Sequence, residues 1–207
     1  MKKNAILAVA LLALISPAFA APRHSHSALT LKPLSSNKAV TVGVEYTMFE
    51  NDNADQNAYG ISLRYDKAFA PLKKDGDYWS WNLGLYWNTG SEESGQPGAR
   101  DMDFTVMGIR YGIDANFVVA PRTTIFVGPR VGYAIYEYET FNIQNGNIVE
   151  EDEGAITYGF AGGVRYKLEN SNGVVEAGFM HTWYAFTEEA MGTKEANTIY
   201  VGAGFAF

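Results

Sequence analysis

Apolar and polar residues alternate along most of the chain, and the alternation is clearest in Asn197–Phe207. There every odd-numbered position from 199 to 207 is apolar, whereas the even-numbered positions are small or have a polar tip. A period of two residues predicts a β-strand with one apolar face, and about ten residues is the length that a tilted strand needs to cross a membrane. Because an unpaired strand edge promotes aggregation, we expect this strand to pair with the first strand and close a barrel.

The same alternation predicts eight antiparallel strands, an even number, as in bacterial transmembrane β-barrels. The predicted strands are Val40–Phe49, Ala58–Phe69, Trp79–Thr89, Phe104–Val118, Thr123–Gln144, Asn147–Leu168, Val174–Phe186 and Asn197–Phe207. Glycines and the charges in the middle of the strands share the face opposite the apolar one. A soluble barrel would instead place its apolar face inward. We therefore predict an all-β fold, an eight-stranded antiparallel transmembrane β-barrel with its apolar face toward lipid.

Two Asn-Gly dipeptides predict the register of neighbouring strands. Asn145-Gly146 is typical of a two-residue type I′ hairpin loop, which would place Ile135 opposite Ile156 on the apolar face. Asn172-Gly173 would in the same way place Arg165 opposite Met180 on the inner face. A slip of one residue would turn either pair to the wrong side of the sheet, so both turns agree with the predicted faces.

The first twenty residues have the pattern of a secretory signal peptide. Lys2 and Lys3 precede the apolar stretch Ala5–Ile15, and Ala18-Phe19-Ala20 supplies a small-residue cleavage site. The apolar stretch is too short for a transmembrane helix. We expect the polar segment Ala21–Lys38 to be a flexible periplasmic tail and residues 39–207 to form the barrel.

Composition narrows the class of protein further. Without Lys2 and Lys3 the chain has 14 basic and 23 acidic residues, a net charge of −9, which argues against nucleic-acid binding. There are no cysteines, and a closed barrel needs no disulfides. Aromatic residues at 14% and the 21 glycines suit a small barrel with interfacial rings and a crowded interior. No phosphate-binding loop, zinc-ligand spacing or catalytic triad is visible in the sequence, and we expect no cofactor.

The signal peptide, the eight strands and the final Phe207 resemble the small outer-membrane β-barrels of the opacity-protein and outer-membrane-protein A or X type. The resemblance extends over Val40–Phe207 and rests on architecture and on the last strand. It implies a location in the outer membrane of a Gram-negative bacterium, among outer-membrane lipids and lipopolysaccharide. It also implies that Phe207 is read by the outer-membrane assembly machinery.

The charged residues on the inner face form a nearly balanced set. They are predicted to fill the lumen as a network of ion pairs, because an eight-stranded barrel is just wide enough to be filled by side chains and unpaired buried charges are costly. The network residues are Glu45, Arg64, Asp66, Arg110, Asp114, Arg130, Arg165, Lys167 and Glu176. The turn at Asn172-Gly173 makes Lys167 and Glu176 diagonal neighbours. A structural plug is the main hypothesis, and a gated narrow channel is the alternative.

The predicted outer loops are strongly acidic, and the fifth and sixth strands extend past the membrane as a long hairpin. The Asn145-Gly146 register puts Glu139 opposite Asp152, a like-charge pair. Clustered oxygen ligands suit hard divalent cations, so we predict a weak Ca²⁺ or Mg²⁺ site at Glu139, Glu150 and Asp152. As an alternative, the edges of the hairpin could add a strand to a partner.

His181 is the only histidine in the predicted strands, and its parity turns it outward. Outer-membrane lipid A deacylases use a histidine, a serine and an acidic residue on the lipid face. The serine expected two residues after the histidine is absent, because Trp183 occupies that position. Glu188 and Glu189 could orient His181 only from a loop, so we interpret His181 as an interfacial residue.

Aromatic residues are expected in two girdles that fix the depth of the barrel in the bilayer. The periplasmic girdle is predicted to contain Tyr65, Trp79, Trp81, Phe117, Tyr166, Phe205 and Phe207. The outer girdle is predicted to contain Phe49, Tyr59, Trp87, Phe104, Trp183 and Phe186.

These patterns together predict a monomeric outer-membrane barrel without catalytic residues. Its expected role is structural or surface-interacting: envelope integrity, or adhesion through acidic loops to an extracellular partner. A narrow small-solute channel and a lipid A-modifying enzyme are the two alternatives.

Overall fold

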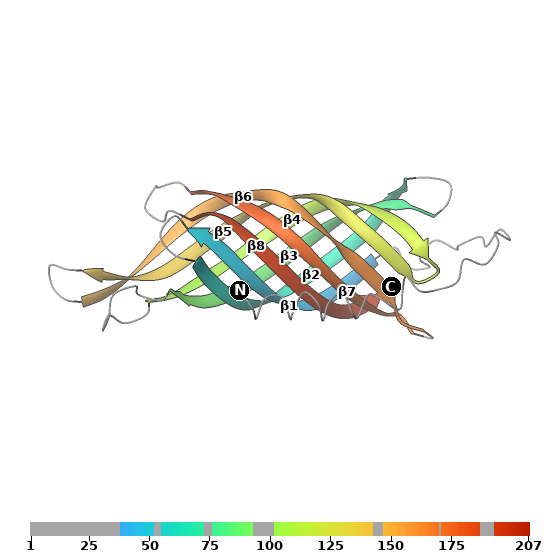
Figure 1. Cartoon of the computed structure of the whole chain (residues 1–207). Helices are drawn as coiled ribbons and strands as arrows, with labels where there is room; N and C mark the ends of the chain where they lie inside the picture. The colour runs from blue at the N-terminus through green and yellow to red at the C-terminus, as the bar shows by residue number, and fades with distance from the viewer. Residues whose placement is uncertain are drawn as a thin grey trace.

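The computed structural model describes residues 38–51, 55–72, 76–92, 102–142, 147–169, 171–186 and 193–207. The predicted signal peptide and nearly all of the predicted tail lie outside these ranges and remain predictions. Eight strands follow one another around a closed antiparallel barrel (Figure 1). They are β1 Lys38–Asn51, β2 Asp55–Pro71, β3 Tyr78–Glu92, β4 Met102–Ala120, β5 Thr123–Asn142, β6 Asn147–Lys167, β7 Gly173–Phe186 and β8 Thr193–Ala206. No helix among the described residues is long and apolar enough to cross a membrane.

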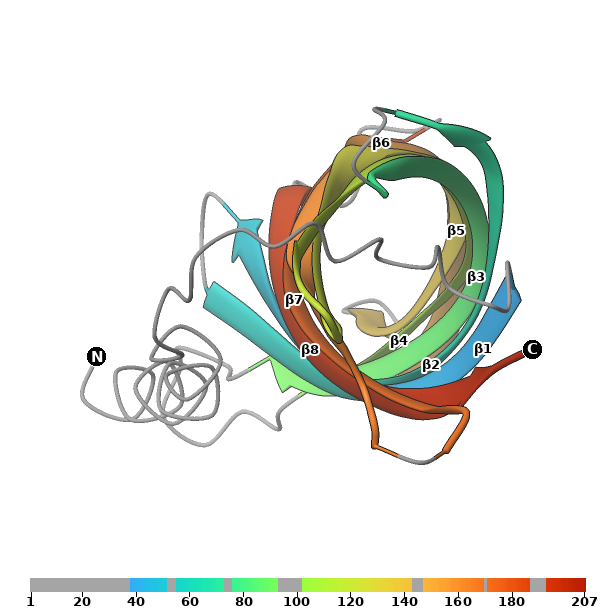
Figure 2. The ribbon, with the colours of Figure 1, turned by 90° about the vertical axis from the view of Figure 1, so that its right-hand side faces the viewer.

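The first and last strands close the barrel, as predicted. β1 pairs with β8 in a register that sets Val44 opposite Val201. At the end of this seam the backbone groups of Lys38 and Phe207 exchange two hydrogen bonds of 3.2 and 2.9 Å. Lys38 therefore belongs to the barrel and not to the tail. The view along the axis shows the resulting ring of strands (Figure 2).

The two faces of the wall differ as the alternation predicts. Val44 and Ile156 expose 64% and 63% of their surface on the outside, whereas Thr41, Asp114 and Phe126 are almost completely buried inside. An apolar outer face is stable only in contact with lipid, because exposed apolar patches of this extent are rare on soluble proteins. The fold class predicted from the sequence is confirmed.

The register between β5 and β6 differs from the predicted one by two residues. Ile156 lies opposite Tyr133 and not opposite Ile135, and the last pair joins Asn142 to Asn147. Four residues, 143–146, therefore separate the last paired positions, where a two-residue loop was expected. Because the shift is an even number, every side chain keeps its predicted face.

The register between β6 and β7 differs by four residues. Arg165 lies opposite Glu176, Met180 lies opposite Ala161, and Lys167 faces Val174. Beyond the pair of Lys167 and Val174, the amide of Leu168 donates to the carbonyl of Gly173 at 2.9 Å, so the turn is longer than a two-residue hairpin. Lys167 is still diagonal to Glu176, as predicted, but Arg165 lies directly opposite Glu176 and forms the ion pair with it.

Glycine at position 204 allows the closing strands to approach closely. A Cβ atom added to Gly204 would clash with the carbonyl oxygen of Val40 and lie 2.7 Å from the Cα atom of Thr41. Both contacts are with backbone, which cannot rotate away. At Gly84 the nearest atom to such a Cβ is the carbonyl oxygen of Leu63 at 3.7 Å, an ordinary contact distance.

We predict that Gly204→Ala destabilises the barrel by about 1–3 kcal/mol, because the seam must open to fit the methyl group. Urea unfolding in lipid vesicles, followed by tryptophan fluorescence, measures the effect. Gly84→Ala is the matched control and should unfold at nearly the wild-type urea concentration. Equal stability of the two variants would contradict the close approach at the seam.

Candidate functional site

Arg64 is the centre of the charged interior. Its Nη2 atom donates to Asp66 at 2.7 Å and to Asp114 at 3.0 Å, and its Nη1 atom lies 3.5 Å from Glu176 and 3.3 Å from the hydroxyl of Tyr200. These partners come from β2, β4, β7 and β8. One guanidinium therefore joins strands on opposite sides of the lumen, which its fork of five N–H donors allows.

Two more arginines complete the network on the far side of the lumen. Arg130 donates to Asp114 at 2.6 Å, and Arg165 lies 3.0 Å from Glu176 and 3.2 Å from Asp66. Each of the three carboxylates thus contacts two guanidinium groups. These shared contacts offset the free-energy cost of removing the charges from water, which is several kcal/mol for an isolated buried ion.

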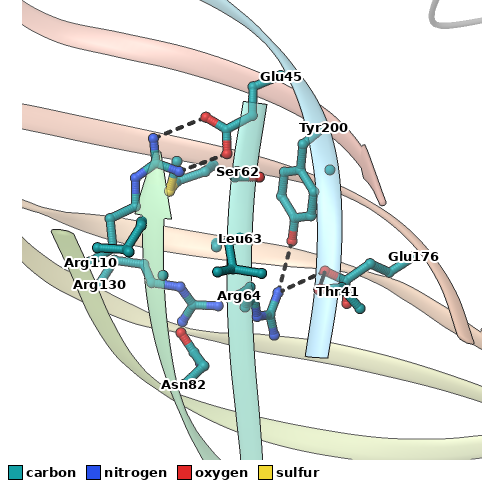
Figure 3. Close-up of a pocket in the computed structure, with 15 residues that line it drawn as sticks. Thr41, Glu45, Ser62, Leu63, Arg64, Asn82, Arg110, Arg130, Glu176 and Tyr200 are labelled. Atoms are coloured by element: carbon teal, nitrogen blue, oxygen red, sulfur yellow. Dashed lines mark hydrogen bonds and ion pairs between the residues drawn. The ribbon is translucent and has the colours of Figure 1, made fainter. Parts of the chain in front are cut away.

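Arg110 and Glu45 form a separate pair nearer the outer end. Both nitrogens of the guanidinium fork reach the carboxylate, at 2.9 and 3.1 Å. The ring of Tyr86 lies 3.5 Å from the guanidinium carbon, a cation–π contact. Figure 3 shows this pair on one side of the central cavity and the Arg64 contacts on the other.

The central cavity between these groups is small. Its volume is about 40 Å³, and Thr41, Asn82 and Tyr200 are among its lining residues. Since one water molecule requires about 10–15 Å³ of such space, the cavity has room for about three waters. The Nε atom of Arg64 and the Nη2 atom of Arg130 have no hydrogen-bond partner in the described part of the chain and can donate to such waters.

The structure brings eight of the nine predicted lumen residues into ion pairs. The ninth, Lys167, has no ion pair among the described residues and faces Val174 near the periplasmic end. Phe126 is buried on the inner face beside the network. Its ring lies 4.8 Å from the guanidinium carbon of Arg64 and 5.4 Å from that of Arg165.

Aromatic side chains close the outer half of the lumen. Phe49 and Phe104 are 1% and 4% exposed and meet edge to face, with their ring centres 5.7 Å apart. Tyr136 stacks on Phe104 at 5.3 Å, and Tyr184 lies beside Phe49 at 5.9 Å. We refer to Phe49, Phe104, Tyr136 and Tyr184 as the aromatic plug.

The assignment of Phe49 and Phe104 to the outer girdle is therefore wrong. Phe49 shares the parity of Glu45, and Phe104 shares the parity of Arg110, so alternation alone turns both rings inward. Both had been assigned from their position near a strand end. The side chain of Phe186, also assigned to that girdle, lies outside the described residues.

His181 faces outward and has partners on β8. Its Nδ1 atom is 2.8 Å from Oδ1 of Asn197, and its Nε2 atom is 3.5 Å from a carboxylate oxygen of Glu195. Asn197 in turn donates to Glu50 at 2.9 Å. The position two residues on from His181 is Trp183, which contacts the imidazole edge to face at 4.2 Å. The sequence did not predict the β8 partners, because Glu188 and Glu189 are nearer in the chain; both lie outside the described residues.

An acidic groove lies at the outer rim, where β4, β5 and β6 leave the membrane. It has a volume of about 420 Å³ and is lined by Asp103, Phe104, Thr105, Glu137, Tyr138, Glu139, Glu151 and Asp152. Glu139 lies opposite Glu150 and not opposite Asp152, which faces Glu137. Like charges therefore still oppose one another. Within the described ranges no three acidic or histidine side chains are grouped to hold a metal, and the Glu150 side chain is outside them, so the Ca²⁺ or Mg²⁺ site stays a prediction.

An exposed ion pair joins two periplasmic turns. Arg122 donates to Glu169 at 2.6 Å. This hydrogen bond, together with the positive charge, holds the pKa of the Glu169 carboxyl below its ordinary value. The pair therefore favours the folded state above the ordinary carboxyl pKa, and its contribution is lost as the pH falls through the lowered value.

We predict that Asp114→Asn lowers the free energy of unfolding by about 3–5 kcal/mol, because it leaves Arg64 and Arg130 short of a buried counter-charge. Adding Arg130→Gln should recover part of the loss, so the two changes together should be less destabilising than their sum. Urea unfolding of the four members of this cycle gives the coupling. Glu169→Gln in the exposed pair is the control and should have little effect. Strict additivity would contradict a shared network.

Comparison with known proteins agrees with this geometry. Residues 6–207 match the family described as the outer membrane protein β-barrel domain. Neisserial surface protein A is similar in structure, with a TM-score of 0.57 and 13% identity over 83% of this chain and 98% of that protein. The attachment invasion locus protein of Yersinia pestis, solved with the heparin analogue sucrose octasulfate, has a TM-score of 0.54 and 14% identity over 82% and 97% of the two chains. No curated protein shows significant sequence similarity.

At these identities the solved structures establish the fold alone, whereas the family match extends over nearly the whole chain. The chain belongs to the family of outer-membrane β-barrel proteins and is located in the outer membrane.

Proposed function

We propose that this protein is a closed, non-catalytic barrel that interacts with a cationic surface or protein outside the cell through its acidic rim. The aromatic plug is the observation that carries the proposal, because it fills the lumen above the ion-pair network. With the interior occupied, the outer rim is the part of the molecule available to a partner.

The described part of the interior favours a closed lumen. The central cavity of about 40 Å³ has room for only a few water molecules and is lined by side chains that bind one another. Opening it would require breaking buried ion pairs on one side or separating packed rings on the other. A filled lumen is the ordinary state of an eight-stranded barrel. These features favour a structural barrel over a small-solute channel.

The lipid A-modifying alternative has weaker support. His181 is held by Asn197 and Glu195, and Trp183 occupies the position where the deacylase pattern has serine. Thr182, next to His181, is buried on the lumen side of the wall. A histidine without a nearby nucleophile cannot carry out the two-step chemistry of those enzymes. We therefore assign no catalytic residue.

The acidic rim determines the kind of partner. β5 and β6 remain paired with each other beyond Gly154, where pairing of β6 with the described part of β7 has ended, so their hairpin projects from the barrel (Figure 1). Glu139 lies on this projection, and Glu137, Glu151 and Asp152 lie at its base, where β5 still pairs with β4. The Yersinia protein was solved with a polysulfated ligand, which this rim would repel. A basic partner, such as a lysine-rich segment of a host matrix protein, has the complementary charge.

The closed interior predicts that the reconstituted protein gives no steady single-channel current in planar bilayers. Phe49→Ala combined with Phe104→Ala removes two rings from the aromatic plug, and Arg64→Ala removes the centre of the ion-pair network; because the two layers block the lumen in series, only the triple variant should produce measurable conductance. Tyr59→Ala, on the lipid face, is the control and should stay silent. Circular dichroism verifies that each variant retains its β-structure. Steady conductance by the wild-type protein would support the channel alternative.

The acidic rim predicts adhesion that depends on charge and on salt. Cells carrying the protein should bind a surface coated with a lysine-rich polypeptide, and binding should weaken between about 0.05 and 0.5 M salt as the charges are screened. Neutralising the hairpin by Glu137→Gln, Glu139→Gln, Glu151→Gln and Asp152→Asn should abolish most of it. Glu169→Gln removes a carboxylate from the opposite end and should have no effect. Undiminished adhesion of the neutralised hairpin would refute the proposal.

A further inference from the structure

Four side chains form a lateral row on the outside of the barrel at its periplasmic end. Lys38 of β1 lies directly opposite Lys67 of β2, and Lys67 lies opposite Trp81 of β3. On the other side Lys38 exchanges backbone hydrogen bonds with Phe207. The row therefore reads aromatic, lysine, lysine, aromatic across four neighbouring strands, with about 5 Å between neighbours. We refer to it as the lysine row.

The two lysines at the centre of the row lack an acidic partner. Like charges directly opposite each other destabilise a pair of strands. An anion bound between the two lysines would remove this repulsion. Within the described residues neither Lys38 nor Lys67 forms an ion pair, although eight of the charged residues inside the barrel do. Lys38 lies 6.0 Å from the ring centre of Phe207, a weak cation–π contact that leaves its ammonium accessible.

The row lies at the inner boundary of the apolar band. From Lys38 to Glu50, both on the outer face of β1, there are twelve residues, or about 40 Å along a strand. A tilt of roughly 40° reduces this to about 30 Å across the membrane, close to the thickness of a hydrocarbon core. The lysine row is therefore level with the head groups of the periplasmic leaflet, while Glu50 is level with those of the outer leaflet.

The surface just above the row is apolar. Val40 follows Lys38 on the same face, Tyr65 lies above Lys67, and Phe205, which is 69% exposed, lies above Phe207. The rings of Tyr65 and Trp81 are in contact, with their centres 5.3 Å apart. A ligand bound at the lysine row would thus have two cations at one end and an aromatic and aliphatic wall toward the membrane interior.

We propose that the lysine row is a binding site for a phospholipid of the periplasmic leaflet. The ammonium groups of Lys38 and Lys67 bind the phosphate from both sides, and Trp81 and Phe207 flank the glycerol region. The acyl chains lie along Val40, Tyr65 and Phe205. The phosphate supplies the negative charge that the opposed lysines lack, and the fixed row orients the lipid parallel to the barrel wall.

Native mass spectrometry of the detergent-released protein tests the site. Phosphatidylglycerol added at increasing concentration should give a saturable lipid adduct, whereas diacylglycerol, which has the same chains without the phosphate, should not. Lys38→Gln combined with Lys67→Gln should weaken the adduct about 30-fold, at about fivefold per lysine. Lys167→Gln removes a lysine from the inner face of the same end and should bind as the wild type does.

Several results would overturn the proposal. These are an adduct with diacylglycerol equal to that with phosphatidylglycerol, a double variant that binds normally, or an equal loss in Lys167→Gln. Circular dichroism establishes that the double variant is folded before binding is compared. If it does not fold, the conservative exchange of Lys38 and Lys67 for arginine provides the second measurement. Arginine retains the charge and should restore the adduct, and its failure to do so in a folded barrel would also overturn the site.

Discussion

The need to pair every backbone amide and carbonyl within the membrane is the constraint on which this structure depends. Lipid offers no hydrogen bonds, so a sheet can span the bilayer only if its first and last strands meet. The pairing of β1 with β8 satisfies this need. With only eight strands the ring is narrow, and the side chains on its inner face must bury one another. The outward apolar face, the crowded interior and the glycines at close strand contacts all follow from that closure.

The interior solves the packing problem in two different ways. In the periplasmic half, Arg64 and its partners replace water with ion pairs shared among several strands. In the outer half, the aromatic plug fills the same cross-section with rings. The ion pairs require accurate donor and acceptor geometry at each charged group. The aromatic plug requires only rings of the right size and shape. Two adjacent layers thus fill the lumen by different interactions.

Much of this architecture was predictable because it depends on a period of two residues. The alternation in Asn197–Phe207 identified the closing strand, and parity placed Arg64 and Asp114 inside. The predicted faces are correct although the predicted registers were wrong by two and by four residues, because a shift by an even number keeps each side chain on the same face of the sheet. The same rule, applied to Phe49 and Phe104, would have placed both rings in the lumen.

The register itself could not be predicted, and the individual contacts depend on it. An Asn-Gly dipeptide indicates a turn but not how many residues remain unpaired around it. The pairing of Arg165 with Glu176, and the absence of Lys167 from the network, follow from a longer turn after β6. The β8 partners of His181 were missed for a related reason. Asn197 is sixteen residues away in the chain but is its neighbour across the sheet.

The hydrogen bonds between Lys38 and Phe207 also bear on how the protein reaches its folded state. They join residues that are 169 positions apart, so the contact order of the closing seam is nearly as high as the chain allows. Contacts between distant residues form slowly, because a long loop must be closed before they contribute any free energy. A partly exported chain has open edges and no seam. The closing seam is therefore expected to form late in folding, and its formation removes the last two open edges of the sheet.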